Sequence, residues 1–299
     1  MRAASSTRQS FRPDRDGARL DRVVADHLQC GRRHARELIG LGLVQVSGRR
    51  VSASTPVCRD DVVRVCTPEV AGFGLAQRTP IRIVWEDPRY LAVAKPAGLH
   101  SLAGRTPGSV AELLLAARPD QRHVGPRPAE AGILHRLDRD TSGVMLAAKT
   151  AATYTAARHA FAHREVDKRY LALVAGRVNE ATTIDVPLRR LVTRVRAARG
   201  GEASYRARTQ VYPVETREGW TLVRARMRTG VTHQLRAHLA LLGHPIFGDI
   251  KYGGPPAPAG SRDGQLLHAW RISLRPGPEI VVAPPGDFLL ALARLRNSG

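Results

Sequence analysis

The spacing of hydrophobic positions changes along the chain and separates a small first part from a larger second part. Between residues 18 and 28, apolar residues recur at helical spacing. A second short helix is predicted over residues 32–39, and two short strands over residues 43–46 and 62–65, with a Ser47-Gly48 turn after the first. The pattern therefore predicts a compact helix–helix–hairpin unit.

From residue 80 onward, strand patterns outnumber helical ones. The predicted strands cover residues 81–85, 90–94, 144–148, 170–174, 203–214 and 220–228. Two helices are predicted, over residues 151–163 after the N-cap Thr150 and over residues 232–242 before Gly243. Since several strand pairs are joined by short turns, we expect an α+β fold with a mainly antiparallel mixed sheet and flanking helices. The Arg/Ala/Gly-rich stretch 189–201 is predicted to be a loop.

Composition places the boundaries of four segments. Residues 1–17 are rich in Arg and Ser, lack an apolar run, and are predicted to be a disordered basic arm. Residues 18–66 form the small helical and hairpin domain, and residues 67–79, with Pro, Gly and small residues, are predicted to be a linker. The larger domain is expected to cover residues 80–299.

The charge balance points to a polyanionic partner. The 299 residues carry a formal net charge of +21 with a pI near 11.3, although the excess of arginine over lysine is also what a GC-rich genome produces. In the second predicted helix Arg32, Arg33 and Arg36 share one face, as side chains that follow RNA phosphates would. A solvated basic face is the alternative interpretation of these three residues.

Cysteine use and hydropathy indicate a cytoplasmic protein. Cys30, Cys58 and Cys66 show neither CxxC spacing nor an even count, which favours a reducing compartment. No run of 18 apolar residues is present, so we expect no membrane partner.

Asp138 is the strongest candidate for chemistry. It lies in a polar loop before an apolar strand and is flanked by Arg136 and Arg139, whose charges favour an ionised carboxylate. The alternative is structural, because Asp-x-x-Thr-Ser-Gly is also a favourable turn sequence.

The stretch from His135 to Val144 resembles the HRLDxxTSG motif of RluA-type pseudouridine synthases. Further blocks of that family match in the same order, at residues 84–99, 168–176, 229–239, 243–249 and 267–269. The segment from Arg19 to Val65 is similar to an S4-type RNA-binding domain. The resemblance covers about residues 80–290, with the S4-like unit ahead of it.

The resemblance implies a role for each matching residue. Asp138 would be the essential carboxylate, Tyr170 would stack on the target uracil and serve in proton transfer, and Arg236 would pair with Asp138. Arg136 would fill the gap that the flipped nucleotide leaves in the RNA, because a planar guanidinium can replace lost stacking. The buried uridine must leave its stack first, at a cost of a few kcal/mol. Taken from the residues alone, Arg236 could instead contact a phosphate, and Tyr170 could be a core residue.

The resemblance implies no cofactor, and the sequence gives no sign of one. His233, His238 and His244 are spaced by five and six residues, which does not align metal ligands on one helical face, so no metal is expected. We expect a monomer whose partner is structured RNA, with ribosomal RNA favoured and transfer RNA as the other candidate.

Two positions depart from the family's usual pattern. Val231 replaces an arginine, and Ser101 replaces a proline. The alternative function is therefore an S4-containing RNA-binding protein with impaired catalysis. Replacing Asp138 would distinguish the two. A hydrolase that uses Asp138 and a histidine is a third, weaker hypothesis.

Overall fold

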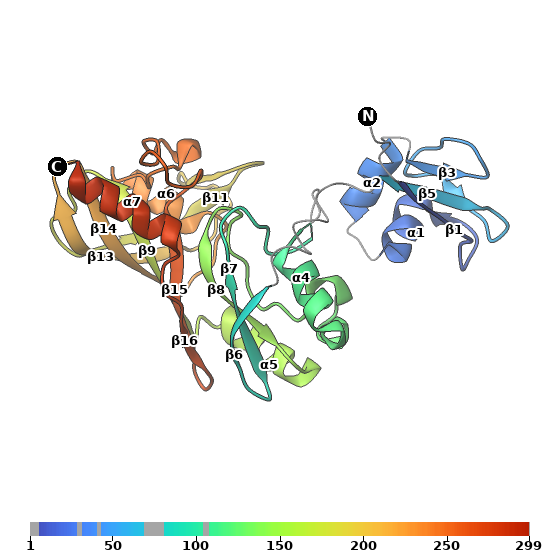
Figure 1. The fold of residues 1–299 in the computed structure, drawn as a ribbon, viewed down its shortest axis with the longest axis horizontal. Helices are drawn as coiled ribbons and strands as arrows, with labels where there is room; N and C mark the ends of the chain where they lie inside the picture. The colour runs from blue at the N-terminus through green and yellow to red at the C-terminus, as the bar shows by residue number, and fades with distance from the viewer. Residues whose placement is uncertain (1–5, 29–31, 41–42, 69–80, 104–107, 299) are drawn as a thin grey trace. The chain divides into compact units, whose positions relative to one another are not determined.

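The structure is a computed structural model that describes residues 6–28, 32–40, 43–68, 81–103 and 108–298. It divides into two compact units, each considered by itself below (Figure 1). The first unit takes Met1–Pro80 together with Leu102–Ala131, and the second takes Ile81–Ser101 together with Gly132–Gly299. Among the described residues, no helix has the length and apolar character needed to cross a membrane. The predicted linker lies outside the described residues from residue 69 onward.

In the described part of the first 68 residues, the chain forms two helices and a small antiparallel sheet. The elements are β1 (Ser6–Phe11), β2 (Ala18–Arg19), α1 (Leu20–His27), α2 (Arg32–Gly40), β3 (Val44–Val46), β4 (Pro56–Val57) and β5 (Val63–Pro68). Strands β1, β5 and β3 form a sheet in that order, and β2 pairs with β4. Both predicted helices and both predicted strands are therefore confirmed.

The prediction of a disordered arm over residues 1–17 is wrong for residues 6–11. These residues form β1, which pairs with β5 from Ser6↔Pro68 to Phe11↔Val63. An unpaired edge of β5 would leave backbone N–H and C=O groups without partners, and β1 supplies them. The ring of Phe11 also stacks on His27, with 3.6 Å between ring centroids. The pairing of β1 with β5 uses backbone hydrogen bonds, so the basic side chains of this segment do not prevent it.

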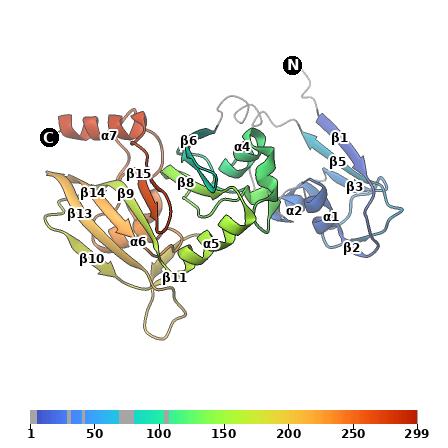
Figure 2. The ribbon, with the colours of Figure 1, turned by 90° about the horizontal axis from the view of Figure 1, so that it is seen from below.

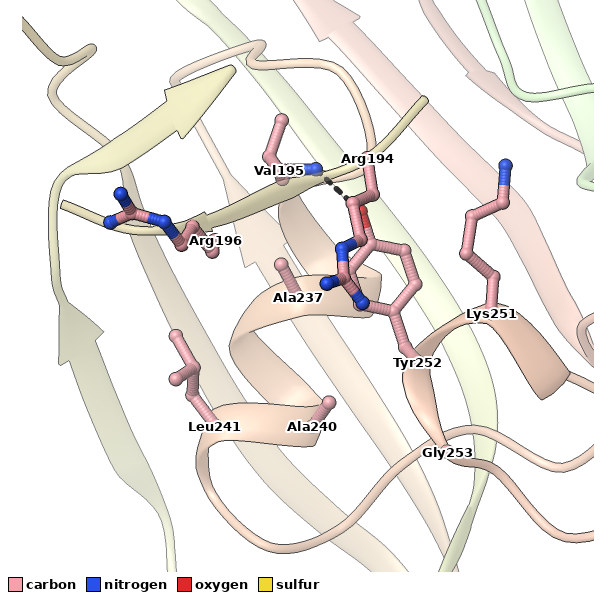
Figure 3. Close-up of a pocket in the computed structure, with 9 residues that line it drawn as sticks. All are labelled: Arg194, Val195, Arg196, Ala237, Ala240, Leu241, Lys251, Tyr252 and Gly253. Carbon is pink, nitrogen blue, oxygen red and sulfur yellow. Dashed lines mark hydrogen bonds between the residues drawn. The ribbon is translucent and has the colours of Figure 1, made fainter. Parts of the chain in front are cut away.

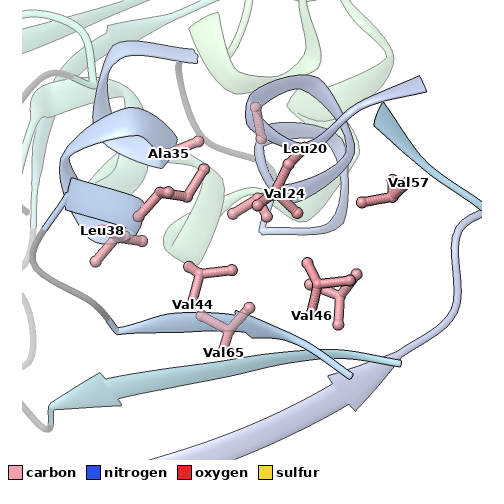
Figure 4. Packing of buried hydrophobic residues seen from close by; sticks show 11 residues of the cluster. Leu20, Val24, Ala35, Leu38, Val44, Val46, Val57 and Val65 are labelled. Carbon is pink, nitrogen blue, oxygen red and sulfur yellow. The ribbon is translucent and has the colours of Figure 1, made fainter. Parts of the chain in front are cut away.

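The core of this small domain lies between the helices and the sheet (Figure 4). Leu20 and Val24 of α1 meet Leu38 of α2 and face Val44 and Val65 of the sheet, all buried. Their helical and alternating spacings place them on the inner faces. Burial of each larger side chain contributes about 1.5–3 kcal/mol to holding the helices on the sheet.

Residues 102–131, which the sequence analysis places in the larger domain, group with the first unit. They form α4 (Val110–Ala117), η1 (Pro119–His123) and η2 (Pro128–Glu130), which pack on one another and add no strand to the large sheet. Helix α4 begins with a capping box, in which Ser109 accepts from the Glu112 N–H and the Glu112 carboxylate accepts from the Ser109 N–H.

The second unit is built on one large sheet (Figures 1 and 2). Its strands are β6 (Arg82–Glu86), β7 (Tyr90–Lys95), β8 (Ser142–Ala148), β9 (Val166–Ala175), β10 (Thr182–Asp185), β13 (Arg208–Arg217), β14 (Trp220–Met227), β15 (Leu267–Leu274) and β16 (Glu279–Val281). Their order is β10-β13-β14-β9-β15-β8-β7-β6, with β16 paired to β15. The α+β, mainly antiparallel fold is thus confirmed.

A parallel pairing in the middle of this sheet joins β8 to β15. His268 lies opposite Ser142 and Ala269 opposite Gly143, while the other described pairings in the sheet are antiparallel. Gly143 has a φ of +127°, and a Cβ there would lie 2.2 Å from the Ala269 carbonyl oxygen. Only glycine permits this close approach of the two strands, next to the Asp138 loop.

Three helices and a short hairpin accompany the sheet. They are α5 (Ala151–Ala162), α6 (Gln234–Leu241), α7 (Gly286–Asn297), and the pair β11 (Leu188–Arg190) and β12 (Val195–Ala197), with the short helix η3 (Ile250–Tyr252) after α6. Thr150 caps α5 as predicted. The prediction of a loop over residues 189–201 is wrong for 189–190 and 195–197, which belong to the strands of this hairpin. Buried Leu188 and Val195 anchor the hairpin, and Arg196 binds Glu202 through two hydrogen bonds.

Candidate active site

Asp138 and Arg236 meet although 98 residues separate them in the chain. The Nη1 of Arg236, from α6, donates to Oδ2 of Asp138, in the loop before β8, at 3.2 Å. The Asp138 side chain is 22% exposed, so a substrate can reach the carboxylate, while that of Arg236 is only 9% exposed. The pairing that the family resemblance implies is present in the structure.

Arg236 is shared with a second carboxylate, Asp249. The Nε and Nη2 of Arg236 donate to the two Asp249 oxygens at 2.6 Å each, and the Asp249 side chain is 1% exposed. Burial works against the charge of Arg236, but Asp249 and then Asp138 raise the pKa of this guanidinium above its ordinary value. Arg236 therefore stays charged and is held in one orientation with Nη1 toward Asp138.

His233 and Tyr252 complete the surroundings of this pair. The Nε2 of His233 lies 3.9 Å from Oδ1 of Asp138, and its Nδ1 shares a 3.0 Å hydrogen bond with the Tyr252 hydroxyl. The guanidinium carbon of Arg236 lies 5.1 Å from the centre of the Tyr252 ring. Burial lowers the pKa of His233, against the opposing charge of Asp138, so the ring is neutral at neutral pH.

Tyr170 lies on β9, within the electrostatic reach of Asp138. Its side chain is buried, and its neighbours across the sheet are Ala225 of β14 and Ala269 of β15. Burial, and then the negative charge of Asp138, raise the pKa of Tyr170 above its ordinary value. The hydroxyl therefore keeps its proton at rest and takes part in hydrogen bonds as a neutral donor or acceptor.

Lys95 holds the loop that carries Asp138. Its side chain is buried, and Nζ donates to the carbonyl oxygens of Pro96, Arg139 and Thr141 at 2.8, 2.7 and 2.8 Å. Burial lowers the pKa of Lys95 to about 7. The three acceptors need all three N–H groups of the ammonium form, so the charged lysine fastens the loop on both sides of Asp140.

Two further side chains fasten the same loop. The Ser101 hydroxyl donates to the Leu137 carbonyl at 2.7 Å and accepts from the Leu137 N–H at 2.9 Å. On the other side, the Leu146 N–H donates to Nε2 of His135 at 3.1 Å. Asp138 therefore follows a residue whose backbone donor and acceptor are both occupied, which limits its freedom before any substrate binds.

Arg136 and the α2 arginines are the remaining predicted site residues. Arg136 is exposed and makes no hydrogen bond or ion pair with the residues that the structure describes. In the first unit, Arg19, Arg32 and Arg36 all donate to Asp21, at distances from 2.6 to 3.4 Å. The side chain of Arg33, the third predicted arginine, lies outside the described residues.

The Asp21 carboxylate is fully buried, while its three arginines are about half exposed. Burial alone would raise the pKa of Asp21, but the hydrogen bonds from Arg19, Arg36 and Arg32 hold it well below the ordinary value. One negative charge thus orders three positive ones, and the cluster keeps a net positive charge toward solvent.

The histidines that could suggest a metal serve separate hydrogen bonds. His238 bonds to Thr209 and the Val186 carbonyl, and His244 bonds to the Ala175 carbonyl. Among the described residues, no group of three His, Cys, Asp or Glu side chains is placed to hold a metal ion. Of the three cysteines, Cys58 is exposed and free, whereas the side chains of Cys30 and Cys66 lie outside the described part.

Sequence reasoning missed Asp249, His233, Tyr252 and Lys95 as parts of the site. Lys95, His233 and Asp249 are polar residues inside blocks that resemble the family, whereas Tyr252 lies after the end of such a block. No spacing rule connects any of the four to Asp138. Val231, where the family has arginine, packs with Tyr252 against a small buried cluster. The loss of that cation leaves the Asp138–Arg236 pair intact.

The arginine-bound aspartate before a central strand of a mixed sheet supplies a group that can act as a base or a nucleophile, and the basic helical domain suits a nucleic-acid partner. The chain belongs to the RNA pseudouridylate synthase family, whose profile matches residues 89–241, and an S4 domain matches residues 18–63. It is therefore an isomerase that acts on RNA.

Relatives and solved structures agree with this assignment. "Ribosomal large subunit pseudouridine synthase D" of Xylella fastidiosa is 34% identical, covering 98% of this chain and 94% of the relative. The protein of the same name from Pseudomonas aeruginosa is 35% identical over 94% of this chain and 93% of its own length. The structure of "Human RNA Pseudouridylate Synthase Domain Containing 4" shares the fold, with a TM-score of 0.60, 24% identity, and coverage of 75% of this chain and 97% of the other.

Proposed function

We propose that this RNA pseudouridine synthase acts on ribosomal RNA and that Asp138 is its catalytic carboxylate. The observation that carries the second part is the Asp138–Arg236 contact at 3.2 Å in a partly exposed position. The first part is supported by the relatives named for the large ribosomal subunit. We infer further that the protein works as a monomer in the cytoplasm.

Asp138 and Tyr170 have separate roles in the proposed reaction. The Asp138 carboxylate, paired with Arg236, starts cleavage of the bond between uracil and ribose, either by attack or by taking the 2′ proton. The freed uracil rejoins the ribose through C5, so the leaving base is also the entering one and no cofactor is required. The N1–C1′ bond breaks and a C5–C1′ bond forms, and the proton that C5 loses is matched by the proton that N1 gains. Tyr170 would pack against the uracil and serve in this proton transfer.

Arg136 supports the proposed flipping of the nucleotide. Its guanidinium is exposed and unpaired among the described residues, so it can enter the RNA stack where the uridine leaves. Loss of stacking costs a few kcal/mol, and a planar cation between neighbouring bases restores part of it. The α2 arginines would hold RNA phosphates at the S4 domain.

Replacement of Asp138 tests the proposed catalytic role. We expect Asp138→Asn to abolish pseudouridine formation in a large-subunit rRNA transcript while the transcript still binds with nearly wild-type affinity. Asp185→Asn, which removes the same charge from an exposed site on β10, should leave both properties unchanged. Pseudouridine formed by Asp138→Asn at the wild-type rate would disprove the role of Asp138.

A comparison of substrates tests the proposed RNA class. Purified protein should form pseudouridine at discrete positions of the large-subunit rRNA transcript and not in bulk transfer RNA. Modification of transfer RNA alone would overturn the ribosomal assignment and leave the enzyme class intact. The binding-only alternative is not favoured, because the family assignment and the intact Asp138–Arg236 pair both point to catalysis.

A further inference from the structure

A hollow of about 410 Å³ lies next to the Asp138 site, between β12, α6 and η3 (Figure 3). Tyr252 connects the two places, because its ring lines the hollow and also lies against Arg236. The volume falls within the range of about 300–1,000 Å³ that is usual for ligand pockets. None of the roles assigned above uses this hollow.

The floor of the hollow is apolar and has small side chains. It consists of Ala237, Ala240 and Leu241 of α6 (Figure 3). Leu241 is 51% exposed, which is unusual for a leucine next to a cavity and leaves apolar surface in contact with water. The two alanines leave space above the helix that a flat group could occupy.

The walls of the hollow are fastened to each other. The Val195 N–H donates to the Tyr252 hydroxyl at 2.9 Å (Figure 3), and Nζ of Lys251 donates to the Thr193 carbonyl at 3.1 Å. These bonds tie the β11–β12 hairpin to η3. The hollow is therefore formed before a ligand arrives, which reduces the entropy cost of binding.

The rim of the hollow carries positive charge that no carboxylate neutralises. Arg194 is exposed and makes no ion pair with the described residues, and Lys251 is bonded only to a backbone carbonyl among them. Arg196, by contrast, makes two hydrogen bonds to Glu202, which Arg189 also contacts at 3.1 Å. None of the described residues that line the hollow is acidic.

We propose that this hollow binds the RNA nucleotide next to the target uridine. The base would lie on the apolar floor beside the Tyr252 ring, and a flanking phosphate would contact Arg194 and Lys251. A nucleotide is the ligand class that combines a flat, largely apolar group with an adjacent anion, and RNA continues on both sides of an everted uridine. The proposal rests on the proposed function, which places that uridine at Asp138.

Filling the hollow tests whether a base enters it. We expect Ala240→Trp to raise the Kd for the large-subunit rRNA transcript about tenfold, since base stacking in such sites is worth about that factor. The matched control is Ala152→Trp, at an exposed position of α5, which should bind like the wild type. Equal Kd values for Ala240→Trp, Ala152→Trp and the wild type would overturn the proposal.

Removing the rim charges tests the phosphate contacts without altering the floor. Arg194→Ala and Lys251→Ala should each lower the slope of log Kd against log salt by about 0.7 to 0.9. Arg294→Ala removes the same charge from an exposed position of α7 and should leave the slope unchanged. Slopes that stay at the control value in both rim variants would count against the phosphate contacts and overturn the proposal.

The readouts separate this proposal from the proposed function. Pseudouridine formation by the wild-type protein reports on the function, whereas Kd and its salt slope report on the hollow. An active wild-type enzyme with unaltered binding in the variants would contradict the hollow alone. An inactive wild-type protein whose RNA binding weakens in Ala240→Trp would contradict the function and support the hollow.

Discussion

Arg236 binds Asp249 more closely than it binds Asp138. Two hydrogen bonds of 2.6 Å connect it to Asp249, against one of 3.2 Å to Asp138. Asp249 thus fixes the plane of the guanidinium, and the Nη1 group points to the carboxylate that faces the substrate.

We predict that Asp249→Asn lowers kcat about 100-fold with little change in RNA affinity, because a small misplacement of Arg236 costs that much. Breaking the buried pair should also reduce the free energy of unfolding by about 3–5 kcal/mol. Single-turnover kinetics, filter binding and urea unfolding measure the three quantities. Asp185→Asn serves as control, and a wild-type kcat in Asp249→Asn would show that Asp249 does not position Arg236.

Lys95→Met should release the Asp138 loop. The substitution leaves the carbonyls of Pro96, Arg139 and Thr141 without their shared donor, and each buried unsatisfied group costs about 1–3 kcal/mol. We expect a lower free energy of unfolding and a kcat reduced at least tenfold, with RNA affinity retained.

Lys149→Met is the matched control for this loop. Lys149 also donates to a backbone carbonyl, that of Asp87, and pairs with Glu86, but it does not touch the Asp138 loop. The Lys149→Met variant should have a somewhat lower free energy of unfolding and a wild-type kcat. The loop argument fails if the two lysine variants lose kcat to the same extent.

Asp21→Asn should weaken RNA binding although it makes the protein more positive. Without the buried carboxylate, Arg19, Arg32 and Arg36 repel one another and lose their common orientation. Asp26→Asn on the same helix, at a 71% exposed side chain, changes the net charge equally and should bind RNA as well as the wild type or better. Tighter RNA binding by Asp21→Asn would mean that net charge outweighs the arrangement of the arginines.

His135 should make the protein less stable in acid. Burial lowers the pKa of His135 to about 3 from its ordinary 6.5, and a proton on Nε2 would break the bond from the Leu146 N–H. Between these pH values the unfolded chain binds a proton that the folded chain excludes. The free energy of unfolding therefore falls as the pH falls from 6.5 toward 3, by up to about 1.4 kcal/mol per pH unit from this group.

Urea unfolding between pH 4 and 6.5 measures this dependence. The slope of the unfolding free energy against pH should be shallower in His135→Gln than in the wild type. His163→Gln, at an exposed position after α5, should retain the wild-type slope. An unchanged slope in His135→Gln would assign the acid sensitivity to other groups.

Local sequence patterns predicted many of the helices and strands, but they could not predict contacts between residues far apart in the chain. The helices at residues 20–27 and 151–162 and the strand at residues 144–148 follow from periodicity and capping, which depend on neighbours in the chain. Strand β15 was missed because its polar and apolar residues do not alternate cleanly where the strand is covered on both faces. Helix α4 was also missed, although Ser109-x-x-Glu112 is a recognisable capping box.

For the site, the family resemblance identified Asp138, Tyr170 and Arg236, and the structure brings the first and third into contact. The second carboxylate on Arg236 could not be predicted, because its position depends on how η3 returns toward α6. Ser101 shows the same limit. At the sequence level it is a departure from the family, whereas in the fold its hydroxyl occupies both backbone groups of Leu137.

The parallel pairing of β8 with β15 sets an order on the assembly of the enzyme during synthesis. Because β15 lies between β8 and β9, a growing chain that ends before residue 267 has two half-sheets with no strand to join them. The S4 domain, complete within the first 68 residues, can fold and meet RNA long before this happens. Competence for chemistry therefore arrives only after β15 has been made, so a product that terminates before this strand would occupy RNA without modifying it.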